Sequence, residues 1–303
     1  MKNLRWALVL VVGIVGCGAG SVSDGDDVSA DGDALSTTTP GFVTLIKDQR
    51  KCGAPICGGY FLVQPNRSVA QIYVASIDWS KSSLSGPEIA TATGAADGEL
   101  LLLGTLTRQD RKTGTKNFVV QDAWRGMPGR APASGDLFAT VADNGTRCIQ
   151  APCKSNSLTK VNSTSQPKAF SDLSVASAAA AFVDQSWLSG RVMSSGAIVS
   201  GSVVSGEQLP GGTQTVLDAT QVFLHLPEGM GPCPQHVVSC SGSKVQVFER
   251  DANRCVIGTG CAAPGMCSMM MPACADGYSL STWREGSNAC AAYACDPTWV
   301  VQQ

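Results

Sequence analysis

Short runs of apolar residues, separated by clusters of Gly, Asp, Asn and Ser, follow one another along the chain from residue 41 onward. Runs of this length between turn-forming residues are typical of β-strands. In the first part of the chain they predict five strands, at 42–46, 60–63, 72–76, 100–106 and 118–124. Ser85, Gly86 and Pro87 before Glu88 form a helix start signal between the third and fourth strands. The predicted order is therefore β-β-β-α-β-β.

The same order returns further along the chain. Cys52 and Cys57 enclose a turn with Ala-Pro inside it, and Cys148 and Cys153 enclose a second such turn 96 residues later. Phe138, Leu158 and Asn162 also stand 96 residues after Phe42, Leu62 and Asn66. An Ala-rich, helical run at 177–187 and strands at 197–201 and 216–226 complete the second copy. We interpret the chain as a duplication, with repeats at 41–132 and 133–229.

Five strands with a helix between the third and fourth is the element order of an OB-type Greek-key barrel. We therefore predict a mainly β protein with two tandem small five-stranded OB-like barrels. A pair of small β-sandwiches is the alternative, because periodicity alone does not fix strand pairing.

From residue 230 to 303 the pattern weakens and cysteines replace it. Eight cysteines lie there, and 244–250 is the one clear strand. A segment of this size with little periodic apolar pattern needs cross-links to fold, so we predict a disulfide-rich module. Eight cysteines allow 105 connectivities. The only pair that we predict within it is Cys290–Cys295, which repeats the Cys-x4-Cys spacing.

The N-terminus is typical of an export signal at 1–16, with a charged start and an apolar run too short to span a bilayer. It ends in Ile14-Val15-Gly16-Cys17, which resembles the lipobox of bacterial lipoproteins, where the cysteine thiol carries diacylglycerol. Gly18 follows, where retention in the inner membrane would need Asp, so the prediction is an outer-membrane or cell-surface location. An ordinary signal peptide with an incidental cysteine is the alternative. Residues 17–40, rich in Gly, Ser, Thr and Asp, predict a flexible linker.

Cysteine count agrees with export. The chain has thirteen cysteines, and lipidation of Cys17 leaves an even number for an oxidising compartment. The predicted disulfide cysteines are Cys52, Cys57, Cys148, Cys153, Cys233, Cys240, Cys255, Cys261, Cys267, Cys274, Cys290 and Cys295. A zinc half-site or a redox pair at each Cys-x4-Cys turn is the alternative.

Charge argues against polyanionic partners for the chain as a whole. Removing Lys2 and Arg5 with the signal leaves 20 basic residues against 24 acidic ones, a net charge of −4. Such a chain has no overall attraction for nucleic acid or anionic lipid.

Few residues point to catalysis. The chain has two histidines, His225 and His236, and lacks the spacings of a nucleophile elbow, a zinc-protease pair or a phosphate loop. We predict no enzyme activity, no resident cofactor and no metal ion.

Three groups of residues leave an alternative open. Met266 and the run 269–271 are either apolar filler or Cu(I) ligands. Five tryptophans either pack in the core or line a ligand face: Trp79, Trp124, Trp187, Trp283 and Trp299. Asn66, Asn144 and Asn162 begin glycosylation sequons, which indicate surface turns.

The stretch DQRKCGAPICGGYF at 48–61, followed by Asn66-Arg67 and by YVASID at 73–78, resembles an uncharacterised domain family found in predicted lipoproteins of myxobacteria and their relatives. The resemblance covers 41–126 well and the second repeat loosely. The segment from Ala273 to Pro297 resembles a tail common in that group. The family brings no known activity, so the resemblance assigns no catalytic residue.

Together these observations predict a non-enzymatic envelope or surface lipoprotein that acts as a structural or interaction module. Its partners would be the membrane, through the lipid anchor, and envelope or extracellular proteins or glycans. A secreted-type protease inhibitor and a ligand- or copper-binding protein are the alternative hypotheses.

Overall fold

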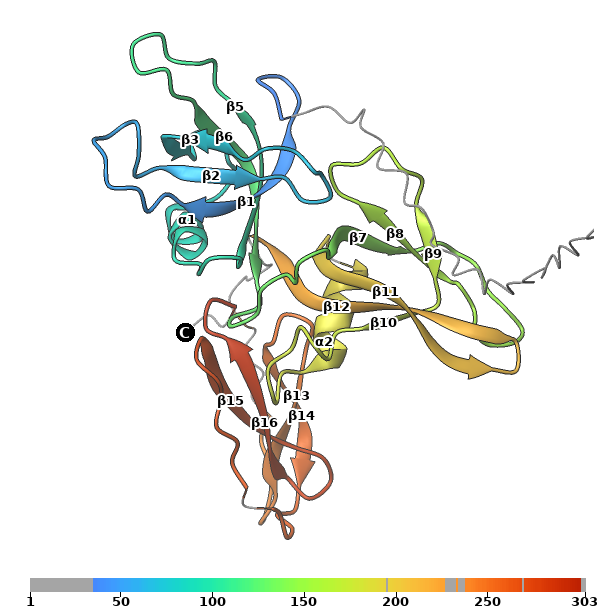
Figure 1. The fold of residues 1–303 in the computed structure, drawn as a ribbon. Helices are drawn as coiled ribbons and strands as arrows, with labels where there is room; N and C mark the ends of the chain where they lie inside the picture. Colours follow the sequence, from blue (N-terminus) through green and yellow to red (C-terminus); the bar gives the residue numbers. More distant parts are fainter. Residues whose placement is uncertain (1–34, 195, 227–232, 234–237, 269, 301–303) are drawn as a thin grey trace, which may run out of the picture. The chain divides into compact units, whose positions relative to one another are not determined.

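The computed structural model describes residues 35–194, 196–226, 233, 238–268 and 270–300. It is mainly β, which confirms the predicted fold class (Figure 1). The first half comprises β1 (Gly41–Lys47), β2 (Tyr60–Val63), β3 (Ile72–Val74), β4 (Ser76–Asp78), α1 (Gly86–Thr93), β5 (Leu100–Leu106) and β6 (Asn117–Gly126). The second half comprises β7 (Leu137–Asp143), β8 (Asn156–Lys160), β9 (Lys168–Phe170), β10 (Asp172–Ser174), α2 (Gln185–Ser194), β11 (Ile198–Leu209) and β12 (Gly212–Leu226).

Strand pairing is the same in the two halves. In the first, β1 lies antiparallel between β2 and β5, β3 pairs with β2, β6 pairs with β5, and β4 runs parallel to β6. In the second, β7 lies between β8 and β11, β9 pairs with β8, β12 pairs with β11, and β10 runs parallel to β12. Only Ala75 separates β3 from β4, so the predicted strand at 72–76 is two short strands that pair at opposite ends of the first half.

Two glycines occupy equivalent places in the two halves. The register of β5 against β6 shifts at Gly104, and that of β11 against β12 shifts at Gly201. A Cβ at Gly104 would collide with the Val119 carbonyl oxygen, and one at Gly201 with the Asp218 carbonyl oxygen. Both bulges therefore need a residue without a side chain.

The two halves share one sheet. Residues Ala123 to Gly126 of β6 pair antiparallel with Phe223 to Leu226 of β12, which makes a single twelve-stranded sheet. The prediction of two separate OB-like barrels is therefore not confirmed, and no closed barrel is present among the described strands. On this edge β6 extends past the short strand β4, and β12 extends past the short strand β10. The backbone N–H and C=O groups that β4 and β10 leave unpaired therefore satisfy one another.

Large apolar side chains fill the junction between the halves. The Phe42 and Trp124 rings lie 5.3 Å apart, and the Phe138 and Phe223 rings lie 5.8 Å apart. Leu101 from β5 and Ile198 from β11 are fully buried in the same cluster. Phe42, Leu101 and Trp124 of the first half thus have Phe138, Ile198 and Phe223 as their counterparts in the second half.

Two asparagines tie the halves together reciprocally. Asn66, after β2, donates to the Phe138 and Val161 carbonyls at 2.7 and 2.8 Å and accepts the Phe138 N–H at 2.9 Å. Asn162, after β8, donates to the Phe42 and Pro65 carbonyls at 2.8 and 3.2 Å and accepts the Phe42 N–H at 2.8 Å. Both have positive φ, 61° and 55°, a conformation that Asn adopts more readily than most residues. Each half therefore caps the first strand of the other.

One predicted helix is confirmed and the other is displaced. α1 begins where Ser85 and Pro87 predicted it, and the Ser85 N–H donates to Glu88 at 2.6 Å. The Ala-rich run predicted as helical at 177–187 is mostly turns, and α2 begins only at Gln185. Asp184 provides the start signal, because its carboxylate accepts the Trp187 N–H at 3.0 Å.

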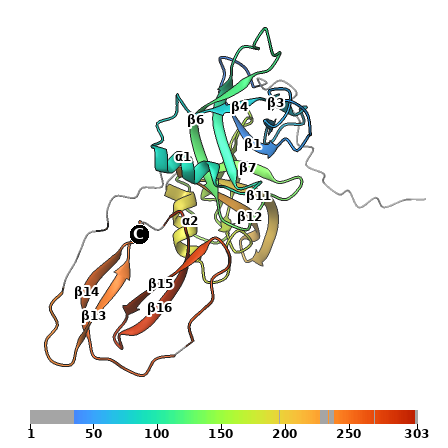
Figure 2. The same ribbon diagram turned by 90° about the vertical axis from the view of Figure 1, so that its left-hand side faces the viewer.

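The C-terminal module consists of two β-hairpins, and Figure 2 shows their strands. They are β13 (Val245–Arg250) with β14 (Val256–Ala262), and β15 (Tyr278–Glu285) with β16 (Cys290–Pro297). Four strands thus replace the single one predicted. In each hairpin, two cysteines from the segment before the first strand are bonded to two cysteines in or beside the second strand. The bonds are Cys233–Cys255, Cys240–Cys261, Cys267–Cys290 and Cys274–Cys295.

The predicted Cys290–Cys295 bond is wrong. Both residues lie in β16, and five residues of extended strand span roughly 16 Å, whereas bonded cysteines have Cα atoms about 4–7 Å apart. A second signal in the sequence was missed. Cys267, Cys274 and Cys295 each stand 34 residues after Cys233, Cys240 and Cys261, so the module is built from two similar hairpins.

Candidate binding groove

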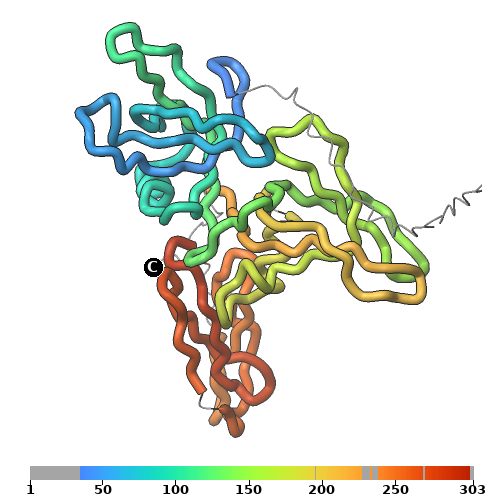
Figure 3. The backbone as a smooth tube through the Cα atoms, viewed as in Figure 1, coloured from blue at the N-terminus to red at the C-terminus, as the bar shows by residue number. Residues whose placement is uncertain are grey.

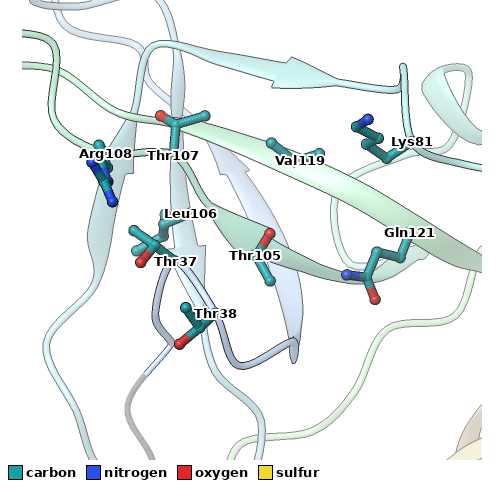
Figure 4. Close-up of a pocket in the computed structure, with 9 residues that line it drawn as sticks. All are labelled: Thr37, Thr38, Lys81, Thr105, Leu106, Thr107, Arg108, Val119 and Gln121. Atoms are coloured by element: carbon teal, nitrogen blue, oxygen red, sulfur yellow. The ribbon is translucent and has the colours of Figure 1, made fainter.

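An open groove of about 770 Å³ lies on the first half (Figure 4). Its lining residues are Thr37, Thr38, Lys81, Thr105, Leu106, Thr107, Arg108, Val119 and Gln121. They supply hydroxyl, amide and cationic groups. Lys81 and Arg108 lie at opposite ends of the labelled set in Figure 4, with threonines between them.

The groove follows from strand alternation in β5 and β6. Phe118 and Val120 of β6 point into the first-half core, so Val119 and Gln121 point to the other face. Thr105 of β5 is half-buried beside the buried Leu106. The segment before β1 forms one wall, because buried Leu35 anchors it and the Leu106 N–H donates to the Ser36 carbonyl at 2.9 Å.

The hairpin between β5 and β6 continues the groove as a basic loop. Nine residues, 108–116, contain four cations: Arg108, Arg111, Lys112 and Lys116. Figure 3 shows this loop extending away from the strands. The net charge of the whole chain is nevertheless negative, because acidic residues elsewhere in the sequence offset these four cations.

The one acidic residue of this loop, Asp110, binds backbone N–H groups of the loop itself. Asp110 accepts the N–H groups of Thr113 and Lys112, both at 2.8 Å, and these bonds hold its pKa below its usual value. In the part of the chain that the structure describes, no carboxylate forms an ion pair with the four loop cations. Asp78 lies near Lys81 but is held mainly by the backbone and side chain of Ser80, which lower its pKa. The loop cations are thus available to a ligand.

The equivalent hairpin of the second half has a different surface. Strands β11 and β12 and their connection contain no Lys or Arg, and the hairpin tip carries Glu207. Summed over the predicted repeats, 41–132 has 11 basic and 7 acidic residues, whereas 133–229 has 5 and 7. The positive charge is therefore a property of the first half alone.

The two Cys-x4-Cys loops carry the disulfides that their spacing predicted, Cys52–Cys57 and Cys148–Cys153. Arg50 holds the first loop. Its guanidinium lies 5.1 Å from the rings of both Phe61 and Tyr73 and binds Asp48 at 2.9 Å. The Tyr73 hydroxyl also donates to the Pro55 carbonyl at 3.0 Å. The residues at 48–61 and 73 that carried the family resemblance therefore shape this loop.

A family model described as a domain of unknown function, DUF6748, matches residues 41–229. The chain belongs to this family. The match confirms the predicted resemblance to an uncharacterised family, and it spans both halves as one domain. A protein from Dictyostelium discoideum, itself uncharacterised, is 26% identical over 266 residues, which is 82% of this chain and 84% of that protein. No solved structure matches the chain.

The histidine and asparagine candidates of the DUF6748 region form contacts within the fold. His225 Nε2 lies 2.7 Å from Asp122 Oδ2, and its ring lies 4.9 Å from that of Trp124, across the junction of β6 and β12. His225 is thus a half-buried strand residue, and His236 lies outside the described residues. Asn66 and Asn162 lie in turns, as predicted, and their side chains also join the halves, which the sequence did not predict. Asn144 donates to the Lys154 carbonyl at 2.9 Å within the second Cys-x4-Cys loop.

The tryptophans do not gather on one face. Trp79 packs against the first-half core, Trp124 against the junction, and Trp187 against the second-half core. Trp299 packs against both half cores, and Trp283 lies under the Arg250 guanidinium at 4.9 Å. The ligand-face alternative is therefore wrong.

The methionines are not filler. Met266, Met270 and Met271 are exposed by 99%, 84% and 68%, and Met269 lies outside the described residues. The Cu(I) hypothesis stays a prediction. In the described ranges, no group of three or more His, Cys, Asp and Glu residues could hold a metal ion.

A buried ionic cluster attaches the C-terminal module to the second half. Asp296, 1% exposed, accepts hydrogen bonds from Arg250 and Arg254, and Arg254 also reaches Asp184 at 2.8 Å. Burial raises the pKa of Asp296, but hydrogen bonds from Arg250 and Ser281 and the nearby Arg254 charge outweigh it and lower the pKa overall. The Trp187 indole N–H donates to the Ala252 carbonyl at 3.0 Å beside this cluster. The cluster is a structural joint.

Cys17, the predicted lipidation site, lies outside the described residues. No described helix has the length and apolarity needed to cross a membrane.

Proposed function

We propose that this protein is an exported, non-enzymatic interaction module of the cell envelope, tethered by a lipid on Cys17 and by the linker at 17–40. The observation that carries this proposal is cysteine pairing. All twelve cysteines from Cys52 to Cys295 are bonded to one another, so no cysteine of the chain is left to pair with Cys17. Six disulfides need an oxidising compartment. The lipobox resemblance accounts for the remaining cysteine, Cys17, as the site of lipid attachment.

The groove supports a binding role. Its lining of threonines, Gln121, Lys81 and Arg108 offers hydrogen bonds and positive charge. Hydroxyl and amide groups both donate and accept hydrogen bonds, which suits them to holding a polar ligand.

Internal duplication supports the same proposal. We infer that the two halves descend from one β-domain. Their strands pair in the same order, Gly104 corresponds to Gly201, and Asn66 corresponds to Asn162. A duplicated scaffold keeps its interior while one surface changes to meet a partner.

Lipid labelling tests the anchoring proposal. Cells that express the protein would be given a clickable palmitate analogue and fractionated. We expect the wild-type chain to be labelled and recovered with membranes, and Cys17→Ser to be unlabelled and released. Ser21→Ala, four residues away, is the matched control and should behave as wild type. Unlabelled wild-type protein in the reduced cytosol would contradict the proposal.

A further inference from the structure

We propose that the groove and the 108–116 loop bind a linear anionic polysaccharide, one that bears sulfate or uronate groups. This inference rests on the proposed function, because it names the class of partner that the exported module would hold.

Charge is the first argument. Arg108, Arg111, Lys112 and Lys116 lie within nine residues, and Lys81 lies at the far end of the adjoining groove. Among the described residues, carboxylates form ion pairs with other arginines of this protein, such as Arg50 with Asp48 and Arg254 with Asp296, but not with the four loop cations. Exposed cations without partners attract anions over about 8–10 Å at physiological salt.

Shape is the second argument. The groove is open, holds about 770 Å³ and has cations at both ends (Figure 4). A compact anion would reach one of them, whereas an extended chain with repeated charges would reach both. The projecting loop adds further contacts along the same direction.

Lining chemistry is the third argument. Thr37, Thr38, Thr105 and Gln121 present hydroxyl and amide groups, which match the hydroxyls between the charges of a sugar chain. None of the nine lining residues is aromatic, so nucleic-acid bases would have no surface on which to stack. Leu106 is buried and Val119 is half-buried, so neither apolar side chain is fully exposed in the groove.

The second half supplies the fourth argument. Its hairpin between β11 and β12 has the same place in the fold but carries Glu207 and no cation. The fold therefore does not require these cations.

Binding measurements on the full oxidised chain test the proposal. Heparin and polygalacturonate would be the anionic probes and dextran the neutral one, with calorimetry at low and at physiological salt. We expect both anionic chains to bind, more weakly as salt rises, and dextran not to bind. Lys81→Ser with Arg108→Ser should weaken binding about tenfold, since two exposed ion contacts are lost. Arg111→Ser with Lys112→Ser should weaken it to a similar degree.

The matched control removes two exposed cations elsewhere. Lys154→Ser with Lys244→Ser lowers the net charge equally but lies outside the groove, so binding should stay within about twofold of wild type. Unchanged thermal unfolding would show that each variant is folded. An equal loss in the control would overturn the site, and no binding to either anionic chain would overturn the ligand class.

Two further probes separate other polyanions. Single-stranded DNA and vesicles with anionic headgroups should bind more weakly than the polysaccharides, and tighter binding to either would overturn the proposal. Its failure is distinct from failure of the proposed function. A surface-anchored protein that ignores polysaccharides contradicts only this inference, whereas a cytosolic protein that binds them contradicts only the anchoring proposal.

Discussion

Phe42, Leu101 and Trp124 in the first half stand where Phe138, Ile198 and Phe223 stand in the second, yet the hairpins that cross this sheet carry opposite charge. The interior is constrained because both halves must present the same pairing edge and the same apolar surface to each other. The loops are free of that constraint. The hairpin between β5 and β6 carries four cations, whereas the hairpin between β11 and β12 carries Glu207.

The halves also differ in what covers them. Only the second half carries the ionic joint to the C-terminal module, in which Asp184 binds Arg254. Its Cys-x4-Cys loop lacks the aromatic pair that holds Arg50 in the first half, and instead the Gly211 N–H donates to the Ala151 carbonyl. The common fold therefore carries different surfaces in its two halves, a basic hairpin in the first and the joint to the C-terminal module in the second.

The largest effect should come from the joint. Asp296→Asn leaves the buried Arg250 guanidinium without its counter-charge and leaves Arg254 with Asp184 alone, and breaking a buried pair costs about 3–5 kcal/mol. Denaturant unfolding should show this loss for the module and the second half. The exposed pair of Asp143 and Arg147 is the control, and Asp143→Asn should have almost no effect. Equal losses in the two variants would contradict the assignment of the joint.

Protonation of Asp296 should also destabilise the wild-type protein at acidic pH. The lowered pKa of Asp296 means that its stabilisation is complete above the unfolded value of about 3.9 and is lost as pH falls through the folded value. Unfolding free energy should therefore fall less steeply below about pH 4 in Asp296→Asn than in wild type. Parallel pH profiles would show that another group controls acid stability.

A smaller effect on stability tests whether the two bulge glycines have the same role in their halves. Gly104→Ala and Gly201→Ala each place a Cβ against a carbonyl oxygen at a bulge, and overpacking of this kind costs about 1–3 kcal/mol. Both variants should lose stability in denaturant unfolding, and Gly104→Ala at least as much as Gly201→Ala, because a Cβ at Gly104 would also meet the Phe118 ring at 2.8 Å whereas one at Gly201 meets backbone atoms alone. Gly53→Ala is the control, because a Cβ there meets nothing within 4 Å. A large loss in only one half would contradict equivalence.

Much of the fold was predictable because strand pattern is local. The strands at 60–63 and 100–106 were predicted to the residue, and the 96-residue offset pointed to Asn66 and Asn162 as counterparts. The pairing of β6 with β12 was not predictable, because it brings together residues that lie 97 to 103 positions apart in the chain. The run at 177–187 misled because alanine favours helix, whereas Ala178 and Ala179 are buried in turns.

The candidate groove was missed for a different reason. Net charge averages over the chain, so the four cations between Arg108 and Lys116 do not show in it. Strand alternation then decided that Val119 and Gln121 share a face with Thr105. That the segment before β1 forms the wall opposite required the tertiary contact between Leu106 and Ser36.

The reciprocal asparagines give the most direct test of the central claim, that two equivalent halves complete each other's first strand. Amide hydrogen exchange of Phe42 and Phe138 would be measured in Asn66→Gly and Asn162→Gly, since glycine keeps the positive φ and removes only the side-chain amide. We predict that Asn66→Gly deprotects Phe138 in the opposite half and leaves Phe42 protected, and that Asn162→Gly does the reverse. Deprotection confined to the substituted half, or none in either, would contradict the account.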